Sequence, residues 1–439
     1  MSFIADKQTL DDLNLLGRYR PHSIIGLFGQ VKTHGGGRLL ESMFHEPLTD
    51  PARINARSGI FQYFQRKKLD FPFTAETVGV MENYLGMGTG SYLVIAAVDV
   101  LQKKMMSSLV RDTRYDLLHQ GLLATISVLQ GLGKLIDQLD KDGDSPYHDR
   151  VLDLRNFFSA RRMEEILRED AQTLSVLKIA SYDHLLKKRY AGEMEMVMGC
   201  LAELDLYIAV SDVARARNFS YAVARPKDEN IFRARSLRHP GLEKAVGNSL
   251  SLDKDINMLF LTGANMAGKS TFMKSFGIGV YLAHMGFPVA AEQMVFSVRD
   301  GIYSSINVPD NLALGYSHFY AEVLRVKKVA EEVSADKDLI VIFDELFKGT
   351  NVKDAYDATL SVTEAFAQFR NCFFVISTHI IEVGETLGER CDNLQFAYLP
   401  TVMDGKVPRY PYIMQEGITS DRHGMMIIEN EGILGIMKN

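Results

Sequence analysis

The amino-acid sequence predicts an all-α domain over residues 1–217, followed by an α/β domain with a mostly parallel sheet over residues 218–439. Apolar residues recur at helical spacing through most of the first half, whereas short apolar runs alternate with helical patterns from Asn218 onward. In the second half, a glycine-rich turn follows one apolar run, and a pair of acidic residues ends another. A chain of 439 residues has room for two such domains, each with its own core.

The helical patterns of the first half have recognisable boundaries. Asp50 is a candidate N-cap with Pro51 at the first helical position, so we expect a helix from residue 52 to about residue 66. The glycine-rich stretch 34–37 is expected to be a flexible break before a short helix. Longer apolar patterns predict further helices over 117–139 and 193–217.

Composition limits the classes of function. The net charge of −6 gives no overall attraction to nucleic acid or to a membrane surface, so any DNA contact must come from a local basic patch. The three cysteines, Cys200, Cys372 and Cys391, form no C-x-x-C pair, and they suggest neither a disulfide framework nor a zinc site. We find no signal-peptide pattern and no apolar run long enough to span a bilayer. We therefore expect a cytoplasmic protein with no membrane partner.

The stretch 259–271 carries the clearest chemical motif. An apolar run ends at Thr262, the pattern G-x-x-x-x-G-K-S occupies 263–270, and a helical pattern begins directly after it. Strand, glycine-rich loop and helix in this order form a phosphate-binding loop, in which backbone N–H groups surround phosphate oxygens. Lys269 is expected to reach the β- and γ-phosphates of ATP, and Ser270 to ligate Mg²⁺. The alternative, a chance glycine-rich turn, does not explain the flanking strand and helix.

A second motif places two carboxylates at the end of a buried strand. The apolar run 339–343 leads directly into Asp344 and Glu345. Asp344 is expected to hold Mg²⁺ directly or through water, and Glu345 to orient or deprotonate an attacking water. A core strand with a capping acid would explain one carboxylate but not both. Together with Lys269 as a catalytic cation, these residues predict hydrolysis of ATP to ADP and phosphate.

Two further residues are candidates for the same chemistry. His379 follows the apolar run 372–376 and is placed to sense the γ-phosphate, although a lone histidine is more often packed or solvated. Ser317 opens a predicted helix whose N-terminus could bind phosphate. Since its own domain already has a phosphate loop, we expect Ser317 to complete the site of a second subunit in a head-to-tail homodimer. The alternative for Ser317 is a simple N-cap.

These motifs resemble those of the MutS DNA mismatch-repair ATPases. T-G-A-N-M-A-G-K-S-T at 262–271 is similar to the family's T-G-P-N-M-G-G-K-S-T, and its Asn-Met pair is not shared by phosphate loops generally. Residues 315–319, 344–350, 378–379 and Arg238-His239-Pro240 resemble further family motifs. The resemblance implies an ABC-type P-loop ATPase domain behind a helical core and lever domain. It implies nucleotide contacts from Gly263, Asn265, Met266, Gly268, Lys269, Ser270 and Thr271.

The resemblance extends more loosely through residues 30–217, but several parts of the family pattern have no counterpart. We find neither the mismatch-reading domain nor the connector domain, and only about ninety residues, 101–192, stand where the family has long levers and a DNA-gripping clamp. We therefore expect an ATPase that dimerises around ATP and couples nucleotide state to DNA binding, without direct mismatch detection. The alternative is an ATP-switched protein-interaction module that contacts no DNA. A transporter-type ATPase is disfavoured by the Asn-Met pair.

Overall fold

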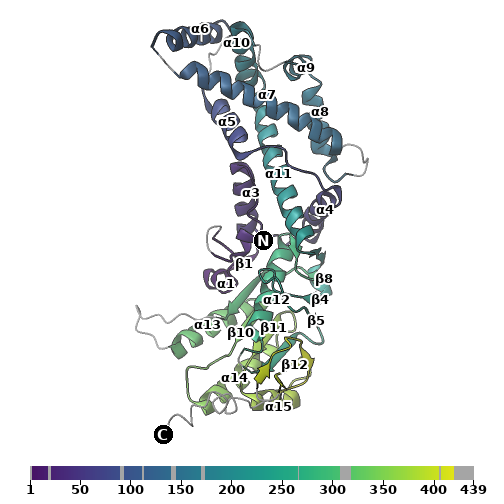
Figure 1. Cartoon of the computed structure of the whole chain (residues 1–439). Helices are drawn as coiled ribbons and strands as arrows, with labels where there is room; N and C mark the ends of the chain where they lie inside the picture. The colour runs from purple at the N-terminus through teal and green to yellow at the C-terminus, as the bar shows by residue number, and fades with distance from the viewer. Residues whose placement is uncertain are drawn as a thin grey trace. The chain divides into compact units, whose positions relative to one another are not determined.

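The structure is a computed structural model (Figure 1), which describes residues 2–17, 21–88, 93–110, 113–139, 145–169, 174–264, 266–306, 318–404 and 407–419. The chain forms two compact units. The helical unit comprises Phe28–Met43 and Gly59–Asp212, and the sheet unit comprises Met1–Leu27, Phe44–Ser58 and Val213–Asn439. The two contiguous domains expected from the sequence, 1–217 and 218–439, remain a prediction; the compact units differ from them mainly in the first 58 residues.

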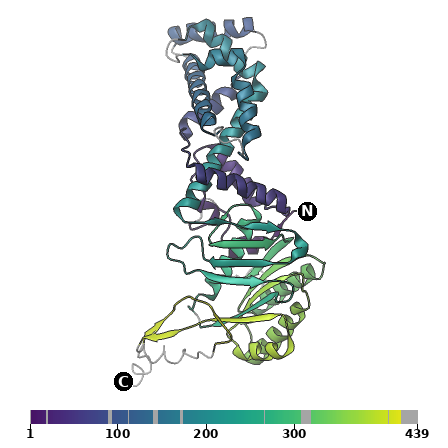
Figure 2. The same cartoon turned by 90° about the vertical axis from the view of Figure 1, so that its right-hand side faces the viewer.

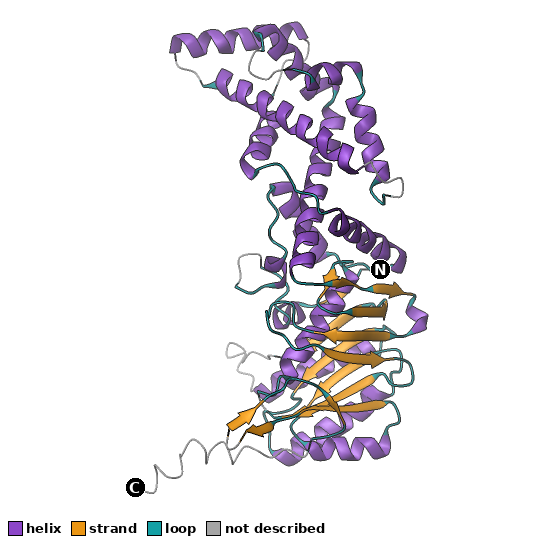
Figure 3. Cartoon of the chain, turned by 45° about the vertical axis from the view of Figure 1, so that its right-hand side comes forward, coloured by secondary structure: helices purple, strands orange, loops and turns teal. Residues whose placement is uncertain are grey.

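The described residues of the helical unit form helices and no strand (Figure 3). The predicted helices over 117–139 and 193–217 are confirmed, with boundaries that differ by at most three residues. None of the described helices is long and apolar enough to cross a membrane. The helices that lie wholly or partly in this unit are α3 (His34–His45), α4 (Pro51–Lys67), α5 (Ala75–Gly86), α6 (Leu93–Val110), α7 (Arg114–Leu139), α8 (His148–Phe158), α9 (Arg161–Leu167), α10 (Val176–His184), the π-helix η2 (Leu185–Arg189) and α11 (Ala191–Ala216).

Helix boundaries in the N-terminal part follow from capping and from close packing. The Asp50 side chain accepts a hydrogen bond from the Arg53 N–H at 2.8 Å, which confirms the predicted N-cap of α4. The expectation of a flexible break at 34–37 is wrong, because α3 begins at His34. A Cβ atom at Gly36 would lie 2.6 Å from a carboxylate oxygen of Asp205 in α11. The glycine therefore serves close packing of the helix.

The main sheet of the sheet unit has seven strands in the order β1-β9-β10-β11-β6-β12-β15. Figure 2 shows the strands and helices of this unit together. All neighbouring pairs are parallel except β12 and β15. The sheet is thus mostly parallel, as predicted, and the carboxyl ends of its parallel strands meet at one edge. Its strands are β1 (Ile4–Ala5), β9 (Gly301–Ser305), β10 (Leu339–Asp344), β11 (Phe373–Ser377), β6 (Met258–Gly263), β12 (Leu394–Leu399) and β15 (Gln415–Glu416).

A second, four-stranded sheet has the order β3-β8-β4-β5. Its strands are β3 (Val223–Arg225), β8 (Gln293–Ser297), β4 (Phe232–Leu237) and β5 (Asn248–Leu252). The short elements outside the two sheets are α1 (Lys7–Asp12), α2 (Ile24–Leu27), β2 (Ser220–Tyr221), η3 (Lys227–Glu229), β7 (Pro288–Val289), β13 (Val402–Asp404) and β14 (Val407–Arg409).

Helix α12 (Lys269–His284) contacts strands of both sheets, namely β6, β9 and β10 of the main sheet and β3 and β4 of the second. Thirteen of its 16 residues are buried, as expected for a helix that is covered on nearly all sides. Glycines allow this close approach. A Cβ at Gly277 would lie 3.0 Å from Ile342 of β10, and one at Gly279 would lie 3.1 Å from Leu237 of β4.

The other face of the main sheet is covered by α13 (His318–Val333), α14 (Val352–Ala367) and α15 (Ile381–Arg390). Alternate residues of β10, such as Val341 and Phe343, pack into the apolar cluster beneath these helices. The central strands are therefore buried on both faces, so the polar residues available for chemistry lie beyond their ends.

Candidate functional site

A cavity of about 620 Å³ lies at the carboxyl edge of the main sheet. The loop after β6, the first turn of α12 and the acidic pair after β10 form one side of it. Since β6, β11 and β10 are parallel neighbours, residues 263 and 344 emerge at the same edge. The cavity thus brings together two motifs that are 75 residues apart in the sequence, counted from Lys269 to Asp344 (344 − 269).

Glycines shape the loop that connects β6 to α12. Gly263 and Gly268 have φ angles of 141° and 103°, which side chains with a Cβ rarely adopt. A Cβ at Gly263 would also lie 2.9 Å from the Leu399 carbonyl oxygen of β12. Met266 lines the cavity and is 78% exposed, so its side chain is free to contact a ligand. Asn265, the other half of the predicted pair, lies outside the described residues.

Lys269 is the first residue of α12, and its side chain folds back over the loop. Its ammonium group donates to the carbonyl oxygens of Gly263 and Ala264 at 2.8 and 3.3 Å and lies 3.8 Å from a Glu345 oxygen. Burial lowers the pKa of Lys269, and the neighbouring carboxylates of Glu345 and Asp344 oppose that shift. Ser270 also lines the cavity, as does Thr271, so that the helix N-terminus faces the cavity.

The acidic pair is oriented by a residue that sequence reasoning missed. The Ser377 hydroxyl at the end of β11 donates to Asp344 at 2.5 Å. The Glu345 N–H lies 3.1 Å from both the hydroxyl and the carbonyl oxygen of Ser377. Glu345 itself has a φ of 56°, an uncommon backbone angle for a residue with a side chain, and the chain bends here directly after β10. A serine in front of the predicted sensor histidine was the available signal, but serines at strand ends are common.

The roles of two further predicted residues, His379 and Ser317, stay predictions. His379 follows β11 at the same edge of the sheet, but its side chain is exposed and is not among those that line the cavity. Its sensor role remains a prediction. Ser317 lies outside the described residues, and its contact with a second subunit also remains a prediction.

The opposite side of the cavity comes from the second sheet and from the C-terminal part of the chain. His239 lies there, and burial, together with the positive charge of Lys274, lowers its pKa. Asn248 at the start of β5 donates to the Tyr412 carbonyl oxygen at 2.9 Å and so holds Tyr412 at the cavity. Arg238-His239-Pro240 was a sequence signal for this wall, whereas nothing local marks Tyr412.

The donor atoms fit a magnesium ion that binds together with phosphate. Ser270 and Asp344 both line the cavity and offer a hydroxyl and a carboxylate oxygen. Among the described residues, no group of three or more His, Cys, Asp or Glu side chains is placed to hold a metal by itself. Mg²⁺ commonly takes one or two protein ligands and completes its shell with phosphate oxygens and water. The residues present match that pattern of ligation.

Two comparisons with known proteins show what this chain is similar to. Residues 259–435 match the family model described as MutS domain V. The chain is also similar to the DNA mismatch repair protein MutS of Petrotoga mobilis (strain DSM 10674 / SJ95), with 27% identity over 288 residues. That match covers 63% of this chain and 34% of the relative, so the chain spans about a third of the length of this relative.

Proposed function

We propose, from the premise that this chain belongs to the MutS family, that it binds and hydrolyses ATP in the cavity of its sheet unit. The observation that carries the proposal is the meeting of the glycine-rich loop with the acidic pair at one edge of the main sheet. A phosphate loop and a carboxylate pair that line one cavity supply both requirements of in-line phosphoryl transfer, which are charge neutralisation and a positioned water.

Each group then has a distinct task. The N–H groups of the loop and of the first turn of α12 bind phosphate oxygens, and Lys269 neutralises the charge that develops on the β- and γ-phosphates. Ser270 and Asp344 would hold Mg²⁺, which supplies electrostatic stabilisation of the transferred phosphoryl group when bound. Glu345 orients the attacking water and accepts its proton. Ser377 is a positioning residue, because it donates to Asp344 and accepts the Glu345 N–H.

The side of the cavity formed by His239 and Tyr412 is suited to the nucleoside part of ATP. Aromatic and apolar groups with a few polar atoms are the usual lining for a planar base. The lowered pKa of His239 favours its neutral form, which can stack on a base without adding a positive charge. His379 completes the proposal as a residue that senses the γ-phosphate from the neighbouring strand end.

We further propose that two chains dimerise head to tail around ATP, with Ser317 of one subunit at the phosphates of the other, and that the dimer couples nucleotide state to DNA binding. Family membership supports a role related to mismatch repair in general. The alternative is that the ATP-dependent dimer acts on a protein partner and contacts no DNA. The net charge of −6 is the observation that keeps this alternative open.

One experiment separates the two. The Mg²⁺-dependent ATPase rate is measured for the full chain without DNA and with duplex, single-stranded and branched DNA, and the affinity for each DNA is measured at several salt concentrations. DNA coupling predicts a rate that changes with one DNA form and an affinity that falls steeply with salt, because phosphate contacts release counterions. Unchanged rates, with no binding to any DNA form at low salt, would reject DNA coupling and favour the protein-partner alternative.

A further inference from the structure

Strand β9 has a strand partner on its outer side for only part of its length. On that side β1 contributes two residues, which pair Ile4 with Gly301 and Ala5 with Ile302. The contact is close, since a Cβ at Gly301 would lie 2.4 Å from the Ile4 carbonyl oxygen. After Asp6 the chain turns into α1, so within the described residues no strand pairs with the rest of β9 on this side. Buried N–H groups there need other acceptors.

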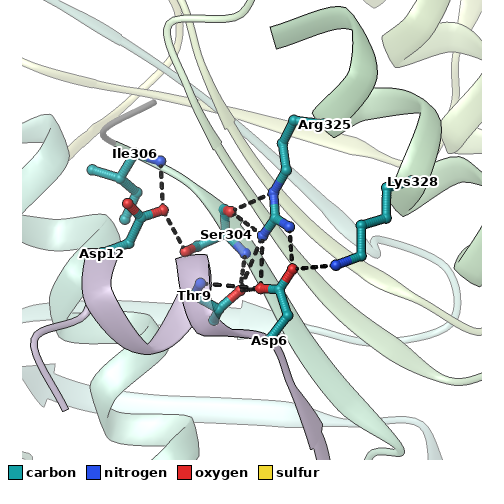
Figure 4. A network of polar contacts seen from close by, with 7 residues as sticks. All are labelled: Asp6, Thr9, Asp12, Ser304, Ile306, Arg325 and Lys328. Carbon is teal, nitrogen blue, oxygen red and sulfur yellow. Dashed lines mark hydrogen bonds and ion pairs between the residues drawn. The ribbon is translucent and has the colours of Figure 1, made fainter. Parts of the chain in front are cut away.

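Side chains of α1 supply those acceptors (Figure 4). The Ser304 N–H donates to the Thr9 hydroxyl oxygen at 3.0 Å, and two residues later the Ile306 N–H donates to Asp12 Oδ2 at 2.9 Å. Alternate N–H groups of a strand point to the same edge, so these bonds continue the β1–β9 ladder as far as Ile306. Asp12, which is buried, also accepts the Ser304 hydroxyl at 2.7 Å.

Arg325 of α13 binds the same end of β9 and also binds the N-terminal segment (Figure 4). Its Nε donates to the Ser304 carbonyl oxygen at 3.0 Å, and both terminal nitrogens of its guanidinium bind the Asp6 carboxylate. Lys328 adds a further contact to Asp6 at 2.7 Å, and Asp6 caps α1 by accepting from the Thr9 N–H at 3.1 Å. Charge-assisted, two-pronged bonds of this kind fix geometry more strongly than single neutral ones.

The strand end held in this way borders the candidate site. Ile306 lines the cavity together with Asp344 and Glu345. Ser305 of β9 is paired with Phe343 of β10, the residue directly before Asp344. A shift in the position of the end of β9 would therefore also move the acidic pair at the end of the neighbouring strand β10.

We propose that the N-terminal segment, residues 3–15, is a positioning element of the nucleotide site. Asp12 fixes Ile306 at the cavity wall, and Asp6 fixes the strand end through Arg325. The segment also contacts α12, because a Cβ at Gly277 would lie 2.8 Å from Leu13. This inference rests on the proposed ATPase function. It assigns a role in turnover to Asp12, which lies 332 positions before Asp344 in the sequence (344 − 12).

The test compares four full-length proteins: wild type, Asp12→Ala, Asp12→Asn and Lys7→Ala. Lys7 is exposed on the same helix and is the matched control. We expect Asp12→Ala to lower kcat for ATP about tenfold, less than the ~100-fold that a 1 Å misplacement can cost, while the Kd for ATP changes less than about twofold. Asp12→Asn should recover most of the rate, because its amide oxygen can accept the same two hydrogen bonds. Lys7→Ala should match the wild type.

Amide hydrogen exchange provides a readout that does not depend on ATP turnover. Asp12→Ala should lose protection at residues 304–306, and Lys7→Ala should not. A wild type that does not hydrolyse ATP would refute the proposed function and leave this readout intact. Two results would overturn the positioning role when the wild type is active. One is a folded Asp12→Ala protein that is as active as the wild type, and the other is an Asp12→Ala protein with unchanged protection at 304–306. If Asp12→Ala does not fold, Thr9→Val removes a single acceptor at nearly constant volume, and a wild-type rate and wild-type protection in that variant would also overturn it.

Discussion

At the residue scale, Ser377 and Asp12 each hold one part of the candidate site in place, through hydrogen bonds to Asp344 and to the Ile306 N–H. Lys269, Asp344 and Glu345 were predicted because each follows a buried strand within a recognisable local pattern, and the cavity brings all three together. Ser377 of β11 donates a hydrogen bond to Asp344 of the neighbouring strand β10. Asp12 accepts one from the Ile306 N–H, which lies 294 residues later in the sequence (306 − 12). Such partners are set by strand order and by the packing of the N-terminal segment, neither of which is encoded by local spacing.

The buried His284 gives a testable prediction at the residue scale. Its Nδ1 lies 2.7 Å from the Leu48 carbonyl oxygen, and the Arg299 N–H donates to its Nε2 at 3.3 Å. A carbonyl oxygen only accepts, so Nδ1 carries a proton. A backbone N–H only donates, so Nε2 carries none, and the ring is neutral. Burial lowers the pKa of His284 from 6.5 to about 4. Protonation of Nε2 would remove the acceptor of the hydrogen bond from the Arg299 N–H.

This pKa predicts a loss of stability in mild acid. Between pH 6.5 and about 4 the unfolded chain binds a proton at His284 that the folded chain does not, so the free energy of unfolding falls as the pH falls through that window. The contribution is at most about 1.4 kcal/mol per pH unit. Urea unfolding of wild type and His284→Gln at pH 7, 6 and 5 should show a shallower pH dependence in the variant. Parallel pH dependences in the two proteins would contradict the assignment.

At the scale of elements, the types of several long helices and buried strands followed from the spacing of their apolar residues. Which elements pack beside each other did not. The predicted apolar strands over 339–343 and 372–376 are observed as β10 and β11. The N-terminal residues were instead assigned to the helical half, yet β1 pairs with β9 and α1 packs at its end. A two-residue strand has too few positions to show alternation, so only the tertiary contacts identify it.

Helix α12 gives a prediction at this scale, because the same substitution should have opposite effects in two helices. Gly277→Ala in α12 would place a Cβ 2.8 Å from Leu13 and 3.0 Å from Ile342, and we expect overpacking to cost about 1–3 kcal/mol. Gly59→Ala in α4 meets nothing within 4 Å and should stabilise by roughly 0.5–1 kcal/mol through helix propensity. Urea unfolding measures both changes. A stabilising Gly277→Ala would show that α12 is not tightly held between the two sheets.

At the scale of the whole molecule, the proposed head-to-tail dimer makes each ATP site the product of two chains. Lys269→Ala and Ser317→Ala should each abolish turnover alone. In a mixed dimer both changes fall on one composite site and leave the other intact, so an equimolar mixture should recover about a quarter of the wild-type rate if subunits exchange freely. If Ser317 acted within its own chain, each subunit of a mixed dimer would carry a damaged site. No recovery on mixing, in proteins that form ATP-dependent dimers, would therefore rule out the shared site.

The central claim is that Glu345 and the glycine-rich loop form one ATP-hydrolysing site. Its most direct test is the Glu345→Gln variant, which keeps the shape of the side chain and removes its basicity. We measure the Kd for ATP with Mg²⁺ and the single-turnover hydrolysis rate of wild type and variant under the same conditions. We expect an ATP affinity within about threefold of wild type and a hydrolysis rate lower by about 100-fold or more, as for the loss of a positioned base. Full turnover by Glu345→Gln, or a wild type that neither binds nor hydrolyses ATP, would contradict the claim.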